Sequence, residues 1–380
     1  MAFATGAIVA NLYYLQPLLD EVTRTYGVGT LAGSTLNMLM QVSYALGLAF
    51  FVPLGDRLPR NRLVPAVFAV SAVTLLAAVL IPSFAGLAIL TCCIGLMSVG
   101  GQILIPYSAD LAIPDHRGRV VGRMMTGLLG GVLLSRVIAG IVDSLLGWQA
   151  MYLLAAGAMA IFAIILHRMM PIENRHSTIP YRELVLGSVR MMKSMPELRR
   201  RAWLGAMGFG AFSVLWSTLA FKLSDAPFHY SPEVIGAFGL LGFAGVLAAN
   251  AAGRLADARR TGFTTVMAAV LLALSFLIGM VGSASIALIA IAIVLLDFGT
   301  QAMHITNQTI IYSLAPHARS RINSAYMVCY FFGGAFGSLA GGLAYSQAGW
   351  TGACILGSCF GLAALIPSIY WARREGPSAP

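Results

Sequence analysis

The chain has 380 residues, of which 58% are hydrophobic and only 10% are charged, and its mean hydropathy is +0.82. Because soluble globular domains carry about 25% charged residues, this composition excludes a water-soluble protein. One membrane-spanning helix needs about 20 apolar residues, so the chain has room for roughly ten to thirteen spans. The composition therefore predicts a polytopic helical membrane protein.

In chain order, apolar runs separated by polar breaks predict about twelve helices. The runs lie near residues 3–20, 31–52, 63–81, 84–108, 120–142, 149–167, 202–221, 233–252, 262–281, 285–310, 322–345 and 350–371. Turn residues mark several breaks, among them Pro82 with Ser83 and a Gly-Trp pair that occurs twice. One long polar stretch separates the sixth run from the seventh.

This stretch indicates the domain organisation. We expect a six-helix bundle over 1–167, a cytoplasmic linker loop over 168–201, a second bundle over 202–371 and a cytoplasmic tail over 372–380. Within the linker, basic and apolar residues alternate from Tyr181 to Met195. Two interpretations stay open for this segment: an amphipathic helix lying on anionic lipid, or a solvated linker.

The basic residues predict the orientation. If consecutive runs cross the membrane in alternating directions, 21 of the 24 Lys and Arg residues fall on one side. Arg24 and Lys222 fall on the other side, and Arg136 lies inside a run. Because cytoplasmic loops carry the excess of basic residues, both termini and the linker are expected in the cytoplasm. The same scatter argues against nucleic-acid binding, which needs one basic stripe.

The second half of the chain repeats the first at an offset of about 202 residues. The recurring residues are Pro114, Arg117, Arg119, Gly131, Gly140, Gly147 and Trp148, matched by Pro316, Arg319, Arg321, Gly333, Gly342, Gly349 and Trp350. Parallel repeats of this kind occur in membrane transporters, which place the substrate site near the bilayer midplane between the repeats.

The loop after the second run resembles a signature of the major facilitator superfamily, G-x-x-x-D-R-x-G-R-R. It reads V-P-L-G-D-R-L-P-R-N-R, in which Asp56, Arg57 and Arg60 match and Val52 and Pro59 replace glycines. The resemblance covers essentially the whole chain. It implies an all-α integral membrane protein with twelve transmembrane helices in two six-helix pseudo-repeats.

In that family this loop latches the cytoplasmic side, and its Asp and Arg residues bond neighbouring helix ends in one conformation. The latch candidates are therefore Asp56, Arg57 and Arg60, together with Asp257 and Arg259 in the second copy, G-R-L-A-D-A-R-R. A carboxylate beside an arginine forms a strong contact that can break when the two halves move.

The fifth run is similar to the glycine-rich signature of proton-coupled drug antiporters, G-x8-G-x3-G-P-x2-G-G. Gly122, Gly131 and Gly140 match, and small residues at such positions let helices approach closely. Antiporters of that branch usually carry an Arg within R-x-x-Q-G in the fourth span. Here Val99 stands at that spacing from Gln102, so the superfamily is better supported than proton antiport.

Ionisable residues inside membrane spans are costly and mark functional sites. In the tenth run, Asp297, Gln301, His304 and Gln308 recur at steps of four, three and four, which places them on one helix face. This face is either a polar seam between helices or the wall of the transport path. Asp297 and His304 are the candidate proton sites, and His304 has the alternative role of a neutral hydrogen-bonding histidine.

Arg136 in the fifth run is the third deep ionisable residue. It has two interpretations: its side chain extends to the interface, or it pairs with a carboxylate inside the membrane. Asp297 is the only deep carboxylate, so we expect an Arg136–Asp297 interaction in at least one state. Four further polar residues keep helical spacing within spans and complete the candidate cavity: Asn11, Tyr14, Gln41 and Gln102.

Together these features predict a secondary active transporter of a small organic solute, working by alternating access, with proton-coupled efflux as the first interpretation. A uniporter or proton symporter for a sugar, amino acid or other metabolite is the alternative, and a non-transporting receptor or scaffold is the alternative of another class. We expect no enzyme and no cofactor or metal, because the sequence lacks H-E-x-x-H, G-x-S-x-G and a phosphate-binding loop. A monomer in the inner membrane, in contact with lipid, is expected.

Overall fold

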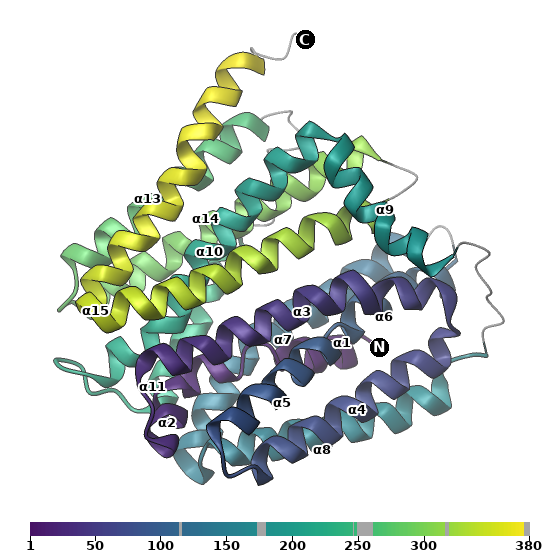
Figure 1. The fold of residues 1–380 in the computed structure, drawn as a ribbon, viewed down its shortest axis with the longest axis horizontal. Helices are drawn as coiled ribbons and strands as arrows, with labels where there is room; N and C mark the ends of the chain where they lie inside the picture. The colour runs from purple at the N-terminus through teal and green to yellow at the C-terminus, as the bar shows by residue number, and fades with distance from the viewer. Residues whose placement is uncertain (114–115, 173–179, 246, 249–260, 316–318, 376–380) are drawn as a thin grey trace. The chain divides into compact units, whose positions relative to one another are not determined.

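A computed structural model of the chain describes residues 1–113, 116–172, 180–245, 247–248, 261–315 and 319–375. Among these residues all regular secondary structure is helical (Figure 1). The chain divides into two compact units. Unit 1 comprises Met1–Gly27, Leu39–Gly187 and Ser231–Gly239, and unit 2 comprises Val28–Met38, Ser188–Tyr230 and Leu240–Pro380. The domain bounds that the repeat predicts, 1–167 and 202–371, stay a prediction.

Unit 1 contains the helices of the first half of the chain and one short helix of the second. These are α1 (Ala2–Ala10), α2 (Leu15–Tyr26), most of α3 (Thr30–Arg57), α4 (Arg60–Leu80), α5 (Phe84–Met97), α6 (Gly100–Leu111), α7 (Arg117–Leu146), α8 (Trp148–Met169) and α11 (Pro232–Ala237). Within this unit α4 lies along α8 (Figure 1), and α7 packs against both α1 and α11.

Unit 2 contains the start of α3 and most helices of the second half. These are α10 (Pro196–Ser224), the end of the 3-10 helix η2 (Phe238–Gly242), α13 (Thr261–Val281), α14 (Ile286–Leu314) and α15 (Arg319–Glu375). Within this unit α10 packs against α15 and α14, and α13 packs against α14 and α15.

The first predicted span, 3–20, is interrupted in the structure. Residues 11–14 form a turn between α1 and α2, with i to i+3 hydrogen bonds from Leu12 N to Val9 O and from Tyr13 N to Ala10 O. Pro17 explains the interruption, because it has no N–H to bond the carbonyl of Tyr13 in a continuous helix. The fourth predicted span, 84–108, is likewise divided between α5 and α6.

The Gly-Trp pairs form the same turn in both halves. Gly147 ends α7 with φ +83°, and Gly349 lies inside α15 with φ +58°, a conformation that a β-carbon disfavours. The following tryptophans are both anchored, since Trp148 Nε1 donates to Thr25 Oγ1 (3.1 Å) and Trp350 Nε1 donates to Gly279 O (2.8 Å). The predicted helices 322–345 and 350–371 are thus joined in α15 with a break at Ala348 and Gly349.

The helices of the described residues are consistent with the twelve predicted spans. Ten helices in the described part of the chain are long and apolar enough to cross a membrane. One of them, Arg321–Trp371, has 51 residues, and about 20 residues suffice for one crossing, so it supplies two spans on either side of Gly349. The shorter apolar helix Pro232–Gly245 lies in the remaining predicted span, 233–252, of which residues 246 and 249–252 lie outside the described residues. The fold is therefore the predicted all-α one.

Close helix crossings explain Gly131 in the fifth span and Gly333 in the eleventh. A β-carbon at Gly131 would overlap the backbone of Gly6, so α7 and α1 touch backbone to backbone. The equivalent Gly333 meets the backbone of Ala206 in the same way, between α15 and α10. Helices approach this closely only where both carry small residues.

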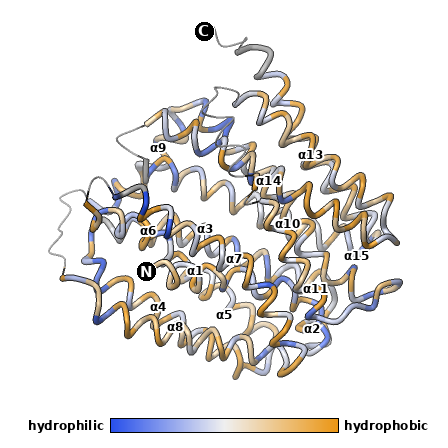
Figure 2. Tube along the Cα trace, turned by 180° about the vertical axis from the view of Figure 1, so that it is seen from behind, coloured by the Kyte–Doolittle hydropathy of each residue, from blue (hydrophilic) through white to orange (hydrophobic). Residues whose placement is uncertain are grey.

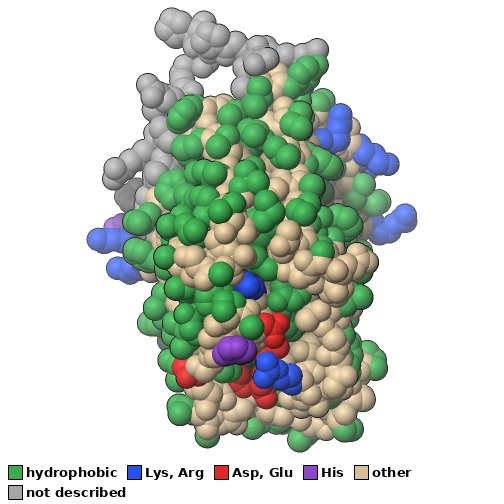
Figure 3. Space-filling view, turned by 90° about the vertical axis from the view of Figure 1, so that its left-hand side faces the viewer, with side chains coloured by type: hydrophobic (Ala, Val, Ile, Leu, Met, Phe, Trp, Pro, Cys, Tyr) green, Lys and Arg blue, Asp and Glu red, His purple; other side chains and the backbone are tan. Residues whose placement is uncertain are grey.

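The surface of the described residues is that of a protein solvated by lipid. Large hydrophobic side chains are exposed along many helices, among them Val73, Leu145, Ile161, Val281 and Ile366. Figure 2 shows hydrophobic residues over most of the length of α4, α8 and α13. Figure 3 shows one face on which hydrophobic side chains predominate and charged side chains gather in a few places. Such exposure suits a bilayer and would be costly in water.

The linker contains a helix that the twelve-helix prediction did not include. α9 (Tyr181–Ser194) precedes α10, which begins at Pro196 instead of the predicted 202. Proline is favoured at the first position of a helix because its missing N–H is not needed there. Both interpretations of this segment stay open with respect to lipid, but the structure shows that it contains a helix.

Candidate transport site and cytoplasmic latch

Arg136 on α7 is buried in unit 1, with 2% of its surface exposed. Its Nε donates to Gln16 Oε1 (2.9 Å), and its guanidinium carbon lies 5.1 Å from the centre of the Tyr13 ring. Tyr13 lies in the turn that interrupts the first span, and Gln16 lies in the first turn of α2, just after it. The interrupted span therefore turns polar groups towards the guanidinium, which favours a buried role for Arg136 over extension to the interface.

Two of the other predicted cavity residues of unit 1 form hydrogen bonds to neighbouring helices. Asn11 Nδ2 donates to Ser71 Oγ on α4 (3.3 Å), and Gln102 on α6 shares a hydrogen bond with Tyr44 on α3. Gln41 and Tyr14 are buried, with 5% and 9% exposure. Asn11 and Gln102 thus link neighbouring helices of the unit.

Asp297 on α14 is buried in unit 2, with 4% exposure. Its Oδ1 accepts a hydrogen bond from Trp216 Nε1 on α10 (3.2 Å). Gln301, one turn further, packs closely on Gly245, where a β-carbon would lie 2.9 Å from Gln301 Cγ. A carboxylate in this position contacts helix α10 of its own unit and does not face lipid.

His304 and Gln308 continue the polar face of α14 against α15. His304 Nδ1 lies 3.1 Å from the Tyr326 hydroxyl, and Gln308 Nε2 donates to Asn323 Oδ1 (3.3 Å). Asn307 Nδ2 also reaches the Tyr326 hydroxyl, at 3.5 Å. The face therefore forms a polar seam within unit 2. This geometry is compatible with a wall of the transport path, because a seam residue can change partners when helices move.

Aromatic side chains surround this seam. The rings of Phe209 and Tyr330 stack with centres 4.2 Å apart, and His304 lies 4.7 Å from the Tyr330 ring centre. Phe212 joins them to Trp216, the donor to Asp297. Around this seam, unit 2 thus combines the Asp297 carboxylate, the His304 imidazole and several flat apolar surfaces, which suits contact with amphiphilic organic molecules.

Arg60 is the latch candidate that the structure places in a buried contact. Its Nη1 lies 2.8 Å from Asp110 Oδ2 at the end of α6, and its Nε donates to Gly55 O (2.8 Å). Its guanidinium carbon is 5.9 Å from the centre of the Tyr107 ring. Arg57 is exposed. The side chain of Asp56, and Asp257 and Arg259, lie outside the described residues.

The Arg60 contacts yield a stability prediction. The substitution Arg60→Ala is expected to destabilise the protein by about 1–3 kcal/mol, because it leaves a carbonyl and a half-buried carboxylate without their charged donor. Thermal unfolding in detergent measures the change. The matched control is Arg62→Ala, which removes an exposed arginine two residues away and should have little effect. Equal losses in both variants would refute a specific role for Arg60.

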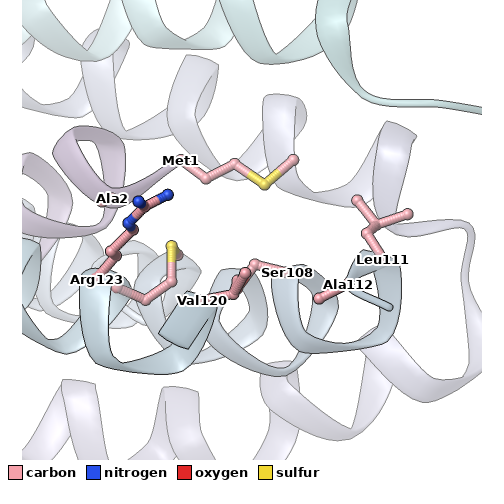
Figure 4. Close-up of a pocket in the computed structure, with 8 residues that line it drawn as sticks. Met1, Ala2, Ser108, Leu111, Ala112, Val120 and Arg123 are labelled. Atoms are coloured by element: carbon pink, nitrogen blue, oxygen red, sulfur yellow. The ribbon is translucent and has the colours of Figure 1, made fainter. Parts of the chain in front are cut away.

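A cavity of about 330 Å³ lies elsewhere in unit 1, beside the start of α1, the end of α6 and the first turns of α7 (Figure 4). It is lined by Met1, Ala2, Ser108, Leu111, Ala112, Val120, Arg123 and Met124. None of the predicted substrate-binding residues lines it. The polar groups around Arg136 in the same unit do not line it either.

Sequence reasoning missed several partners of the predicted residues. None of Gln16, Asp110, Trp216 and Tyr326 is among the candidate site residues. Gln16 precedes Pro17, and a polar residue beside a proline within a span is a signal of an interrupted helix. No sequence signal marks Asp110 as the partner of Arg60, because their contact depends on where α6 ends relative to the start of α4.

The fold and these buried polar groups define a class: a polytopic helical membrane protein built from two repeats, with ionisable residues held inside its spans. The sequence profile of the Major Facilitator Superfamily matches residues 1–337 and, in a second match, residues 228–380. The chain belongs to this superfamily of membrane transporters.

Similar proteins agree with this assignment. The uncharacterized transporter YgaY of Escherichia coli O157:H7 is 42% identical over 372 residues, which cover 98% of this chain and 94% of that protein. The probable transporter SCO4007 of Streptomyces coelicolor is 32% identical over 355 residues, 93% of this chain and 82% of that protein. The chain is thus a membrane transporter.

Two solved structures show the same fold. One is a bacterial homolog of the human lysosomal transporter Spinster in an inward-facing, occupied conformation, with a TM-score of 0.76, 12% identity and coverage of 98% of this chain and 95% of that one. The other is the peptide transporter POT in complex with alafosfalin, with a TM-score of 0.74, 15% identity and coverage of 98% and 94%. At these identities the likeness concerns the fold alone.

Proposed function

We propose that this transporter exports a small organic solute from the cell in exchange for protons. The observation that carries the proposal is the burial of Asp297 in the middle of a membrane-spanning helix, in contact with Trp216 and beside a histidine-containing aromatic cluster. Burial disfavours the charged form of a carboxyl group, and access to water restores it. A conformational cycle that alternates these environments moves a proton with each turn.

In this proposal the substrate contacts polar residues of both repeats. Arg136, Asn11, Tyr14, Gln41 and Gln102 are the binding residues of unit 1. Asp297, Gln301 and His304 are those of unit 2. Arg136 and Asp297 belong to different units, and their interaction in one state of the cycle remains a prediction. Arg60, with Asp56 and Arg57, serves as the latch on the cytoplasmic side.

Flux measurements in proteoliposomes test the proposal. Purified protein is reconstituted with a pH gradient, and transport of cationic dyes, sugars and amino acids is followed together with proton movement. Exchange is expected: substrate moves against the proton. Movement of substrate together with the proton would establish a symporter instead, and flux independent of the gradient would establish a uniporter. Proton movement unaffected by every compound of the panel would contradict the proposed substrate class.

Topology is a separate expectation. With both termini in the cytoplasm, a cysteine introduced at Arg182 in the linker should react with a membrane-impermeant maleimide only after the cells are opened. A cysteine introduced at Arg24, on the predicted outer side, should react in intact cells and serves as the matched control. Labelling of position 182 in intact cells would reverse the orientation and contradict the direction of export.

A further inference from the structure

Helix α9 presents one exposed face that is both apolar and basic. Arg182, Leu186, Val189, Arg190 and Lys193 recur at spacings of four, three, one and three, so they share one side of the helix. All five are exposed, and Leu186 and Val189 keep 46% and 49% of their surface accessible. Glu183 at the edge of this face is the one acidic residue of the helix and lies in its first turn, where it favours the helix N-terminus.

The opposite side of α9 is attached to the protein, so the exposed face has a defined direction. Leu184 is buried, Tyr181 Oη donates to Phe50 O (2.8 Å), and Ser188 Oγ donates to Arg321 O (3.3 Å). Arg199 Nη1 donates to the carbonyl oxygens of Lys193 (2.7 Å) and Met192 (3.4 Å) at the end of the helix. These bonds hold the helix along its length.

Tryptophans of unit 2 mark the level of the membrane interface near α9. Trp203 on α10 is 48% exposed and donates to Ala363 O (3.1 Å), and Arg200 lies over the Trp371 ring (5.3 Å). Tryptophan collects where hydrocarbon meets headgroups. α10 rises about 10 Å from Pro196 to Trp203 at 1.5 Å per residue. The end of α9 therefore lies at the level of the lipid headgroups, within reach of long basic side chains.

We propose that this face of α9 binds the headgroups of anionic phospholipids. The three cations can bind the lipid phosphates. Leu186 and Val189, which lie between the cations, can contact the upper part of the acyl chains. A soluble acidic partner would bind the three cations, but it would gain nothing from the two exposed aliphatic side chains that lie among them. The inference is independent of the substrate and of proton coupling.

A fluorescence experiment on the full chain tests it. The five native cysteines are replaced by alanine, and Leu186→Cys carries an environment-sensitive fluorophore. The protein is reconstituted in phosphatidylcholine alone or mixed with phosphatidylglycerol, each with a headgroup spin-labelled quencher lipid. Quenching is expected to be at least about two-fold greater with phosphatidylglycerol, because each basic residue near an anionic surface adds attraction. Replacing Arg182, Arg190 and Lys193 by glutamine should return quenching to the level in phosphatidylcholine.

The matched control replaces Arg62, Arg119 and Arg168 by glutamine. It removes three exposed arginines near the ends of α4, α7 and α8 and should leave the phosphatidylglycerol effect unchanged. Equal quenching in both lipids, or a phosphatidylglycerol effect that survives loss of the three α9 cations, would overturn the proposal. So would a control variant that loses the effect to the same extent. Elution of every variant as a single species in detergent shows that the compared proteins are folded.

Discussion

The substitution Asp297→Asn is expected to abolish transport driven by a pH gradient, with a loss of about 100-fold or more in the initial rate. Asparagine has almost the same shape and its side-chain oxygen can still accept the hydrogen bond from Trp216 Nε1, so the fold should be kept. What it loses is the capacity to bind and release a proton. Exchange of substrate across the vesicle membrane without a pH gradient should persist, and both rates are measured in the same proteoliposomes.

Three further variants make this result specific. Asp297→Glu restores a titratable group and should recover part of the gradient-driven rate. Trp216→Phe removes the donated hydrogen bond together with part of a buried ring. A hydrogen bond to a charged acceptor contributes about 1.5–3 kcal/mol, so a loss of roughly 10- to 100-fold is expected. If Asp297→Asn kept the gradient-driven rate of the unmodified protein and His304→Gln lost it, the proton site would lie two turns along α14.

The second large effect concerns the crossing of α1 and α7. Gly131→Ala is expected to destabilise the protein by about 3 kcal/mol or more, because the added β-carbon would overlap the backbone of Gly6 and a backbone cannot rotate away. Gly130 is the matched control, since a β-carbon at this neighbouring position meets nothing within 4 Å. Unfolding midpoints in detergent and the yield of folded protein measure both effects.

The repeat extends this prediction to the other unit. Gly333, 202 residues after Gly131, meets the backbone of Ala206, so Gly333→Ala should lower stability to a similar degree. Gly131→Ala with the same unfolding midpoint as Gly130→Ala would contradict the close crossing. If only the Gly333 variant were affected, the two crossings would not be equivalent.

Much of the fold was predictable because membrane insertion leaves a strong signal in the sequence. Long apolar runs located the spans, and the Gly-Trp pairs located a turn that needs a positive φ at Gly147 and Gly349. The interruption of the first span was less accessible. Pro17 lacks the N–H that would bond a carbonyl in the preceding turn, whereas the apolar run in the sequence continues through the break.

The candidate site divides in the same way. Arg136, Asp297 and His304 were recognisable from sequence because an ionisable residue in a span is rare and costly. Their partners were not recognisable, since Gln16, Trp216 and Tyr326 are 120, 81 and 22 residues away from them. The same holds for Asp110, which is 50 residues from Arg60.

By itself, the sequence determined that this protein spans a membrane many times and that its two halves are related. It also identified the few ionisable residues whose burial inside the membrane costs free energy. These conclusions follow from hydropathy and charge, which are local properties. Only the tertiary structure decided which side chains meet, because a helix presents each residue on a face whose neighbour depends on packing. That packing places Asp297 against Trp216, and Arg60 against Asp110.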